Sequence, residues 1–181
     1  MNFSNYFAKS VEQSRYDKQP KVSGEAKNEL LSNLYDCFNI LHRICWGGNL
    51  LPCEIGFSFR MTRAFAYAAP PWNGKKAKIV FNARLCALCS DLHIMMILAH
   101  EMTHIWQYTQ KRCGGHGKDF YKEMQRIGIV GKDPMQMCEN SAFAYVMFMY
   151  SLKNINLQNN FQKLLLTEQK RRKNHAVKKS R

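Results

Sequence analysis

The stretch LHIMMILAHEMTH, residues 92–104, sets the centre of the predicted fold, because an apolar run there ends in the pattern HExxH. The spacing predicts a buried helix. Residues four apart share one face of a helix, so the imidazoles of His100 and His104 can reach a single metal ion. Glu101 lies one step round from His100, where it can take a proton from a water held by that ion. The stretch therefore predicts a metal site at the end of a buried helix.

A catalytic zinc ion usually has three protein ligands and a water, so the two histidines need a partner. His116 lies in the turn GGHGKDF, residues 114–120, after a glycine pair that is expected to end the helix. A tight turn between glycines can present an imidazole to the open side of the metal. We therefore predict that His116 is the third ligand.

Two acidic residues and one longer motif compete with this prediction. Glu123 and Glu139 could each serve as a third ligand of the thermolysin kind. Glu123 falls in a second predicted helix, where a solvated carboxylate explains it adequately. The metzincin pattern fails, because Gln107 and Gln110 stand where its glycine and histidine would be.

Taken together, these motifs resemble those of the SprT-like zinc metallopeptidases. The similarity rests on HEMTHIWQ at residues 100–107, GHGKDF at 115–120 and MQRIG at 124–128, and it extends over residues 28–128. It implies that one Zn²⁺ ion is bound by His100, His104 and His116. It also implies that Glu101 is the general base of peptide-bond hydrolysis and that the substrate is a polypeptide.

The sequence and the resemblance predict an α+β, zincin-like fold. Residues 25–46 have apolar side chains at helical spacing and predict an N-terminal helix, which packs on the sheet. Residues 53–81 supply about three strands of a small, mainly antiparallel sheet. An active-site helix and C-terminal helices follow, the first of them over residues 118–127. By analogy with zincins, the strand at residues 80–82 is expected at the sheet edge, where it would align an extended substrate.

Local signals set the boundaries of these elements and of the domain. Asn82 is expected to cap a short helix, and Ser90 or Asp91 to cap the active-site helix. We divide the chain into an N-terminal extension at residues 1–24, a metallopeptidase domain at 25–166 and a basic tail at 167–181.

The cysteines depart from the pattern of many SprT-like proteins, which carry a C-terminal zinc ribbon of paired cysteines. After residue 116 this chain has only Cys138, so no ribbon is expected. Cys86 and Cys89 have CxxC spacing without a second pair, which favours two small buried residues. Seven scattered cysteines without a signal peptide favour a reducing compartment: the cytoplasm or nucleoid, or the nucleus in a eukaryote. No apolar stretch reaches the length of a membrane span.

Charge is the second informative feature, since 27 Lys and Arg against 13 Asp and Glu give a net charge of +14. The tail has seven cations and one acid, too polar a composition to fold alone, so we expect it to be disordered. Such tails commonly bind nucleic acid by releasing counterions from phosphates, although simple solubility is an alternative. The predicted partner is DNA, single-stranded or with junctions, and the predicted contacts are Lys170, Arg171, Arg172, Lys173, Lys178, Lys179 and Arg181.

The resulting hypothesis is a zinc-dependent metalloendopeptidase acting on DNA-associated or unfolded proteins. One alternative is a non-catalytic nucleic-acid-binding protein with a structural zinc, but such a site needs no base at Glu101. Another is a general cytosolic metallopeptidase unrelated to DNA. An oxyanion stabiliser is not assigned, because Tyr108, Tyr121 and Tyr145 are all available.

Overall fold

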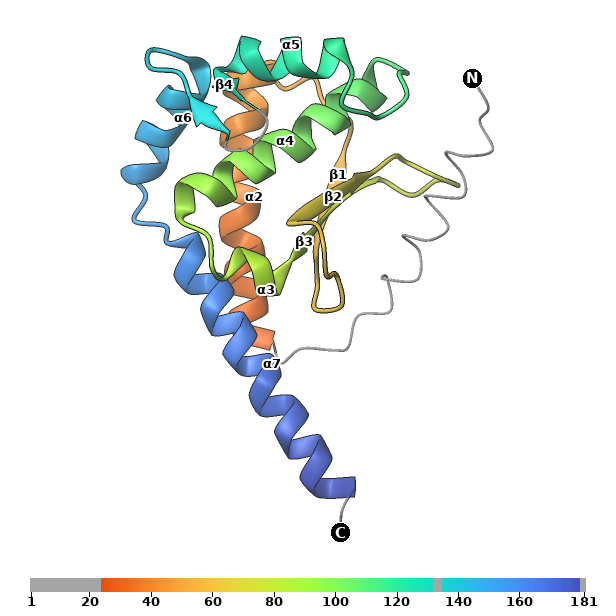
Figure 1. The fold of residues 1–181 in the computed structure, drawn as a ribbon, viewed down its shortest axis with the longest axis vertical. Coiled ribbons are helices and arrows are strands. Elements are labelled where there is room, and N and C mark those ends of the chain that lie inside the picture. The colour runs from red at the N-terminus through yellow and green to blue at the C-terminus, as the bar shows by residue number, and fades with distance from the viewer. Residues whose placement is uncertain (1–23, 132–134, 180–181) are drawn as a thin grey trace.

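The computed structural model describes residues 24–131 and 135–179, with side chains described through residue 177. Its elements are α2 (Gly24–Trp46), β1 (Cys53–Ser58), β2 (Ala66–Ala69), β3 (Ala77–Asn82), α3 (Ala83–Cys86), α4 (Asp91–Thr109), α5 (Lys118–Ile127), β4 (Ile129–Val130), β5 (Gln136–Met137), α6 (Ala142–Ser151) and α7 (Leu157–Lys179). Figure 1 shows α2 and α4 crossing in the body of the molecule, with the sheet to one side. The predicted α+β class is confirmed.

The N-terminal helix α2 forms as its sequence predicts. It buries Leu30, Leu34 and Leu41, which recur at helical spacing. The helix ends where Gly47 and Gly48 adopt positive φ angles of 58° and 79°, a conformation that costs glycine little. Contacts of α2 with β1, α4, α6 and α7 place it at the centre of the core.

The sheet has the three predicted strands but a mixed pairing, in the order β1-β3-β2. β2 pairs antiparallel with β3, whereas β1 pairs parallel with it, so the expectation of a mainly antiparallel sheet is corrected. The reason is the connection at residues 59–65, which skips one strand position. β3 then fills that position, parallel to β1.

This order also corrects the expected edge strand. Residues 80–82 belong to β3, which is the central strand, and five of its six residues are buried, as expected for a central strand. Among the described strands, β2 is the edge strand that contacts α4. The sequence of β3 could not show that this strand is central. The strand order is set by the path of the connection at residues 59–65, and not by the strand itself.

Side-chain caps fix the approach to α4 as predicted. The Asn82 side chain accepts hydrogen bonds from the backbone N–H groups of Arg84 and Leu85 at the start of α3. Its amide also donates to the carbonyls of Met61 and Ala64, which ties the connection at residues 59–65 to the end of β3. At the start of α4, Ser90 accepts from the backbone N–H of His93.

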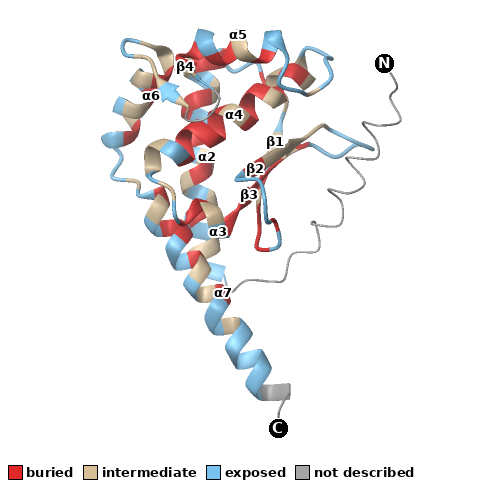
Figure 2. Ribbon diagram, viewed as in Figure 1, coloured by how far each residue is buried: buried red, intermediate tan, exposed pale blue. Residues whose placement is uncertain are grey.

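The C-terminal segment differs from the expected disordered tail, because residues 167–179 continue α7 as helix. The first half of α7 is anchored by the buried side chains of Phe161 and Leu164. The second half projects from the body and is mostly exposed, as the pale blue segment of Figure 2 shows. Helical pairs of Glu168 with Arg171 and Arg172 give this polar segment local stabilisation that composition alone does not reveal.

Some predictions lie outside the described residues. They are nearly all of the N-terminal extension at residues 1–24, the side chains of Lys178 and Lys179, and Arg181. No helix in the described part of the chain combines the length and the hydrophobicity needed to span a bilayer.

Candidate metal centre

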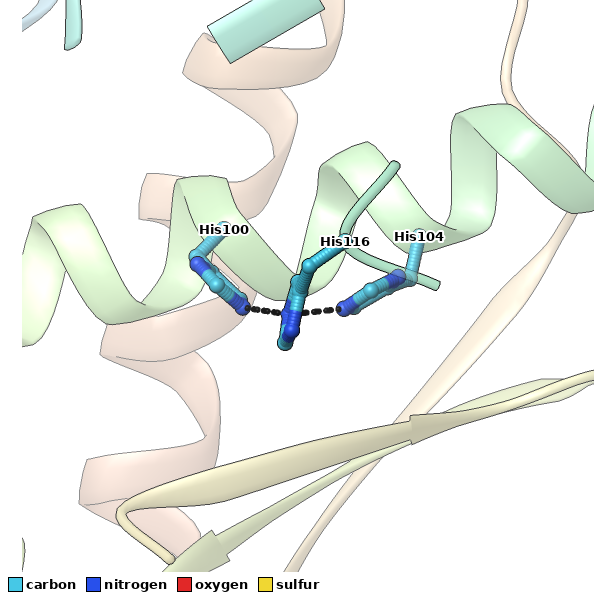
Figure 3. A group of neighbouring side chains, drawn as sticks. All are labelled: His100, His104 and His116. Atoms are coloured by element: carbon cyan, nitrogen blue, oxygen red, sulfur yellow. Dashed lines mark hydrogen bonds between the residues drawn. The ribbon is translucent and has the colours of Figure 1, made fainter. Parts of the chain in front are cut away.

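Three histidine side chains converge at the surface of α4. His100 and His104 lie one helical turn apart on α4, and His116 comes from the turn between α4 and α5. Nε2 of His116 lies 2.9 Å from Nε2 of His100 and 3.1 Å from Nε2 of His104. Figure 3 shows the His116 ring between the other two, with a dashed line from it to each. Among the described residues this is the group of side chains that could hold a metal ion.

The turn that carries His116 lies close against α4 because one of its residues is a glycine. A Cβ at Gly114 would lie 2.7 Å from the ring of Tyr108 on α4, so a larger residue would force the ring or the turn to shift. α5 then begins at Lys118 and ends at Ile127 as predicted, and Gly128 follows it with a φ of 100° that favours glycine. The predicted approach of the glycine-flanked turn to the helix is therefore what the structure shows.

The three imidazoles are held in the neutral form that metal binding requires. Burial, together with the neighbouring His104 and His116, lowers the pKa of His100 to about 3. Burial also lowers the pKa of His104 to about 4, and that of His116 falls for the same reason. Each ring therefore offers a nitrogen lone pair at neutral pH.

Glu101 is the buried acid of the site. It is 6% exposed and faces β2, where the backbone N–H of Ala68 donates to its carboxyl group. Its Oε2 atom is buried and has no hydrogen-bond partner among the described residues. Burial raises the pKa of Glu101 to about 8, although the bond from Ala68 acts in the opposite direction.

The donor set fits a zinc ion. Ligand nitrogens about 2.0–2.1 Å from a tetrahedral zinc lie about 3.3 Å from one another. Nε2 of His116 lies at a similar distance from Nε2 of His100 and of His104, and the ligand atoms of all three residues lie within 4.8 Å of one another. Oε2 of Glu101 is buried without a hydrogen-bond partner among the described residues. Such an atom is expected where a site normally holds a further polar group, such as a water or an ion. A cation there would also favour the ionised form of Glu101, which its burial disfavours.

Phe120 forms an apolar floor under the site. Its ring centroid lies 4.8 Å from those of His100 and His116, and 4.6 Å from that of His104. Phe120 is 1% exposed and comes from the first turn of α5. The sequence indicated it only as an apolar helix residue, although its place four residues after His116 puts it within reach.

The rival third ligands are elsewhere. Glu123 accepts hydrogen bonds from Trp46 at 2.8 Å and from Arg126 at 2.7 Å and 2.9 Å, so its carboxylate is fully engaged away from the histidines. Glu139 is exposed and is not part of the histidine group. The choice of His116 over both agrees with the structure.

The three tyrosines considered as oxyanion stabilisers differ in position, and the cysteines with CxxC spacing are not part of the histidine group. Tyr108 donates from its hydroxyl to the carbonyl of Ala68 on β2 at 3.3 Å, and the Tyr121 ring centroid lies 6.4 Å from that of His116. Tyr145 is an exposed residue of α6. Cys86 is buried, in agreement with a packing role, and burial raises its pKa. Cys89 is only partly buried, so the prediction of two buried cysteines is confirmed for Cys86 alone.

An HExxH helix whose histidines are completed by a third from a following turn defines the metallopeptidase-like class of zincins. Within that class, the chain belongs to the SprT-like family, whose model matches residues 34–139. Neither the curated proteins nor the solved structures contain a match to the chain. The matched region contains the sheet, α4, α5 and all three histidines, and the family implies zinc as the metal.

Proposed function

We propose that this protein is a zinc-dependent metalloendopeptidase. The observation that supports this most strongly is the convergence of three neutral imidazole nitrogens on α4 beside the buried, unpartnered carboxyl oxygen of Glu101. A zinc ion held by His100, His104 and His116 would polarise a scissile carbonyl and bring the pKa of a water toward neutrality.

The residues of the chain divide the remaining work. Glu101 takes a proton from the attacking water at Oε2 and later passes it to the leaving amine. The bond from the backbone N–H of Ala68 holds the carboxyl group so that Oε2 remains available. Phe120 excludes water from the back of the histidine cluster and keeps the rings neutral.

We further propose that the substrates are DNA-associated or unfolded proteins and that α7 provides DNA contacts. The support is the net charge of +14 and the projecting second half of α7, where Lys170 and Lys173 are exposed. Arg171 and Arg172 share the carboxylate of Glu168, so they are less available to phosphates than the two lysines. As a helix, this arm presents its cations in a fixed order and loses less entropy on binding than a flexible tail would.

The test is digestion of an unfolded protein and of a DNA-bound basic protein by the zinc-loaded chain, with and without single-stranded DNA. The expected result is cleavage that stops on chelation of the metal and in the variant Glu101→Gln, with DNA accelerating only the cleavage of the bound substrate. Tight zinc binding without any cleavage would favour the structural-zinc alternative. Cleavage indifferent to DNA would favour a general metallopeptidase.

A further inference from the structure

Gln107 is a buried polar residue of α4 that the proposed chemistry does not use. It is 4% exposed. Its Oε1 lies 2.9 Å from Nδ1 of His104 and also accepts the backbone N–H of Gly115 at 3.2 Å. Its Nε2 donates to the carbonyl of Gly115 at 2.9 Å. A single side-chain amide thus bonds both α4 and the turn that carries His116.

The first bond sets the protonation pattern of His104. An amide oxygen can only accept, so the hydrogen of the neutral ring must lie on Nδ1. Nε2 of His104 is then the lone-pair nitrogen, and it points at the histidine cluster, 3.1 Å from Nε2 of His116. A bond of this kind fixes both the tautomer and the orientation of a metal-binding imidazole.

The other two bonds set the position of His116. Gly115 immediately precedes His116, and its N–H and C=O groups are both bonded to the Gln107 amide. The amide orientation is determined by these bonds, because the opposite orientation would set donor against donor at Gly115 N and acceptor against acceptor at its oxygen. The backbone leading into His116 is therefore tied to the ring of His104.

From these contacts we infer that Gln107 is a positioning residue that couples His104 to the turn of His116 and assembles the metal centre as one unit. This inference rests on the proposed metal site, but it concerns a residue that touches neither the metal nor the substrate. It predicts that loss of the amide misplaces two of the three ligands at once. A buried glutamine that only satisfies a loop would affect stability and leave metal affinity alone.

The decisive variants are Gln107→Met, which keeps the length of the side chain and removes all three bonds, and Gln107→Glu. The glutamate variant keeps the acceptor for His104 and for the N–H of Gly115 but loses the donor to the carbonyl of Gly115. Gln110→Met is the matched control, because Gln110 is the exposed C-cap residue of α4, three residues after Gln107. All are made in the full chain.

Two measurements separate positioning from stability. Zinc affinity is measured by competition with a chromophoric chelator, and we expect a loss of about 10–100-fold in Gln107→Met, a smaller loss in Gln107→Glu and none in Gln110→Met. The tautomer of His104 is read from ¹H–¹⁵N long-range spectra of the metal-free protein. We expect the Nδ1–H form in the wild type and in Gln107→Glu, and a mixture of tautomers in Gln107→Met.

Wild-type zinc affinity in Gln107→Met, an unaltered tautomer in that variant, or equal losses in the Met and Glu variants would each overturn the inference while leaving the metal site intact. A wild-type protein that binds no zinc would instead remove the proposed function and the inference with it. The two failures are therefore distinguishable.

Discussion

Glu101 on α4 and Glu123 on α5 are both 6% exposed, yet their surroundings are opposite. Glu123 receives three hydrogen bonds, two of them from the guanidinium of Arg126 and one from Trp46. Glu101 receives a backbone bond from Ala68 and keeps one oxygen without a partner among the described residues. Burial alone therefore does not distinguish the two acids, whereas their hydrogen bonds do.

A third buried carboxylate extends the comparison to the other end of the molecule. Glu168 on α7 is 1% exposed and accepts hydrogen bonds from Arg171 and Arg172. These bonds lower its pKa, whereas burial raises that of Glu101. Two of the three acids thus have their hydrogen bonds satisfied within the fold, and Glu101 is the one that we propose to be the reactive group.

The largest effect is expected when the same substitution is made at the two acids near the metal centre. Glu101→Gln should reduce peptide-bond cleavage about 10²–10⁴-fold, because glutamine is nearly isosteric but cannot accept the proton. Glu123→Gln should retain cleavage within a few-fold, since its carboxylate does not reach the histidines. The measurement is kcat/KM on an unfolded substrate at equal zinc loading. Similar losses in both variants would contradict the division of roles.

Zinc content should fall when a proposed histidine ligand is replaced and should not change when either acid is replaced. His104→Ala should fall well below one zinc per chain, because it removes a ligand and the partner of Gln107. Glu101→Gln and Glu123→Gln should each keep one zinc per chain. Elemental analysis after dialysis at fixed free zinc checks this. Full zinc in His104→Ala would remove that residue from the ligand set, and loss in Glu123→Gln would restore the rival.

The free energy of unfolding should show the reverse order, with a larger loss in Glu123→Gln than in Glu101→Gln. Glu123→Gln leaves Arg126 without its ion pair and should cost about 1.5–3 kcal/mol, the range for a hydrogen bond to a charged group. The lower half of that range is expected, because the Arg126 side chain is 51% exposed and water can solvate it. Glu101→Gln should leave the unfolding free energy of the metal-free protein nearly unchanged. Urea denaturation of the two variants provides the comparison.

The sequence predicted the histidines because their information is local: a four-residue helical spacing and a glycine-flanked turn. It left Glu123 open because the bonds from Trp46 and Arg126 depend on how α2 meets α5. It placed residues 80–82 at an edge because strand order depends on the connection at residues 59–65. The role of Gln107 had a signal, its position three residues after His104 on the same helix, but only the fold brings Gly115 to it.

The pH dependence of α7 tests whether the ionised carboxylate of Glu168 stabilises this helix. The hydrogen bonds from the arginines hold the folded pKa of Glu168 below its unfolded value of about 4.3. Its contribution to stability is therefore fully present above that value and is lost as pH falls through the folded pKa. Helix content measured by circular dichroism should be higher in the wild type than in Glu168→Gln at neutral pH and equal in strong acid. A difference that persists in strong acid would show that ionisation of Glu168 is not the cause.

The smallest effect concerns the proposed DNA arm, where the pairing of Glu168 predicts two changes of opposite sign. Lys170 and Lys173 are exposed, so replacing both by alanine should lower the salt slope of binding to single-stranded DNA by up to about 1.4, at about 0.7 for each phosphate contact. Glu168→Gln should instead raise the slope, because it releases Arg171, which now binds the carboxylate in a bidentate manner, and Arg172, which donates one bond to it, to bind phosphates. Point variants are preferable to truncation, which would also remove a buried residue of α7.

A salt slope that falls when the lysines are replaced but is unchanged in Glu168→Gln would mean that the arginines face away from the DNA. Indifference to both variants would make α7 incidental to DNA and favour a metallopeptidase that finds its substrates without it.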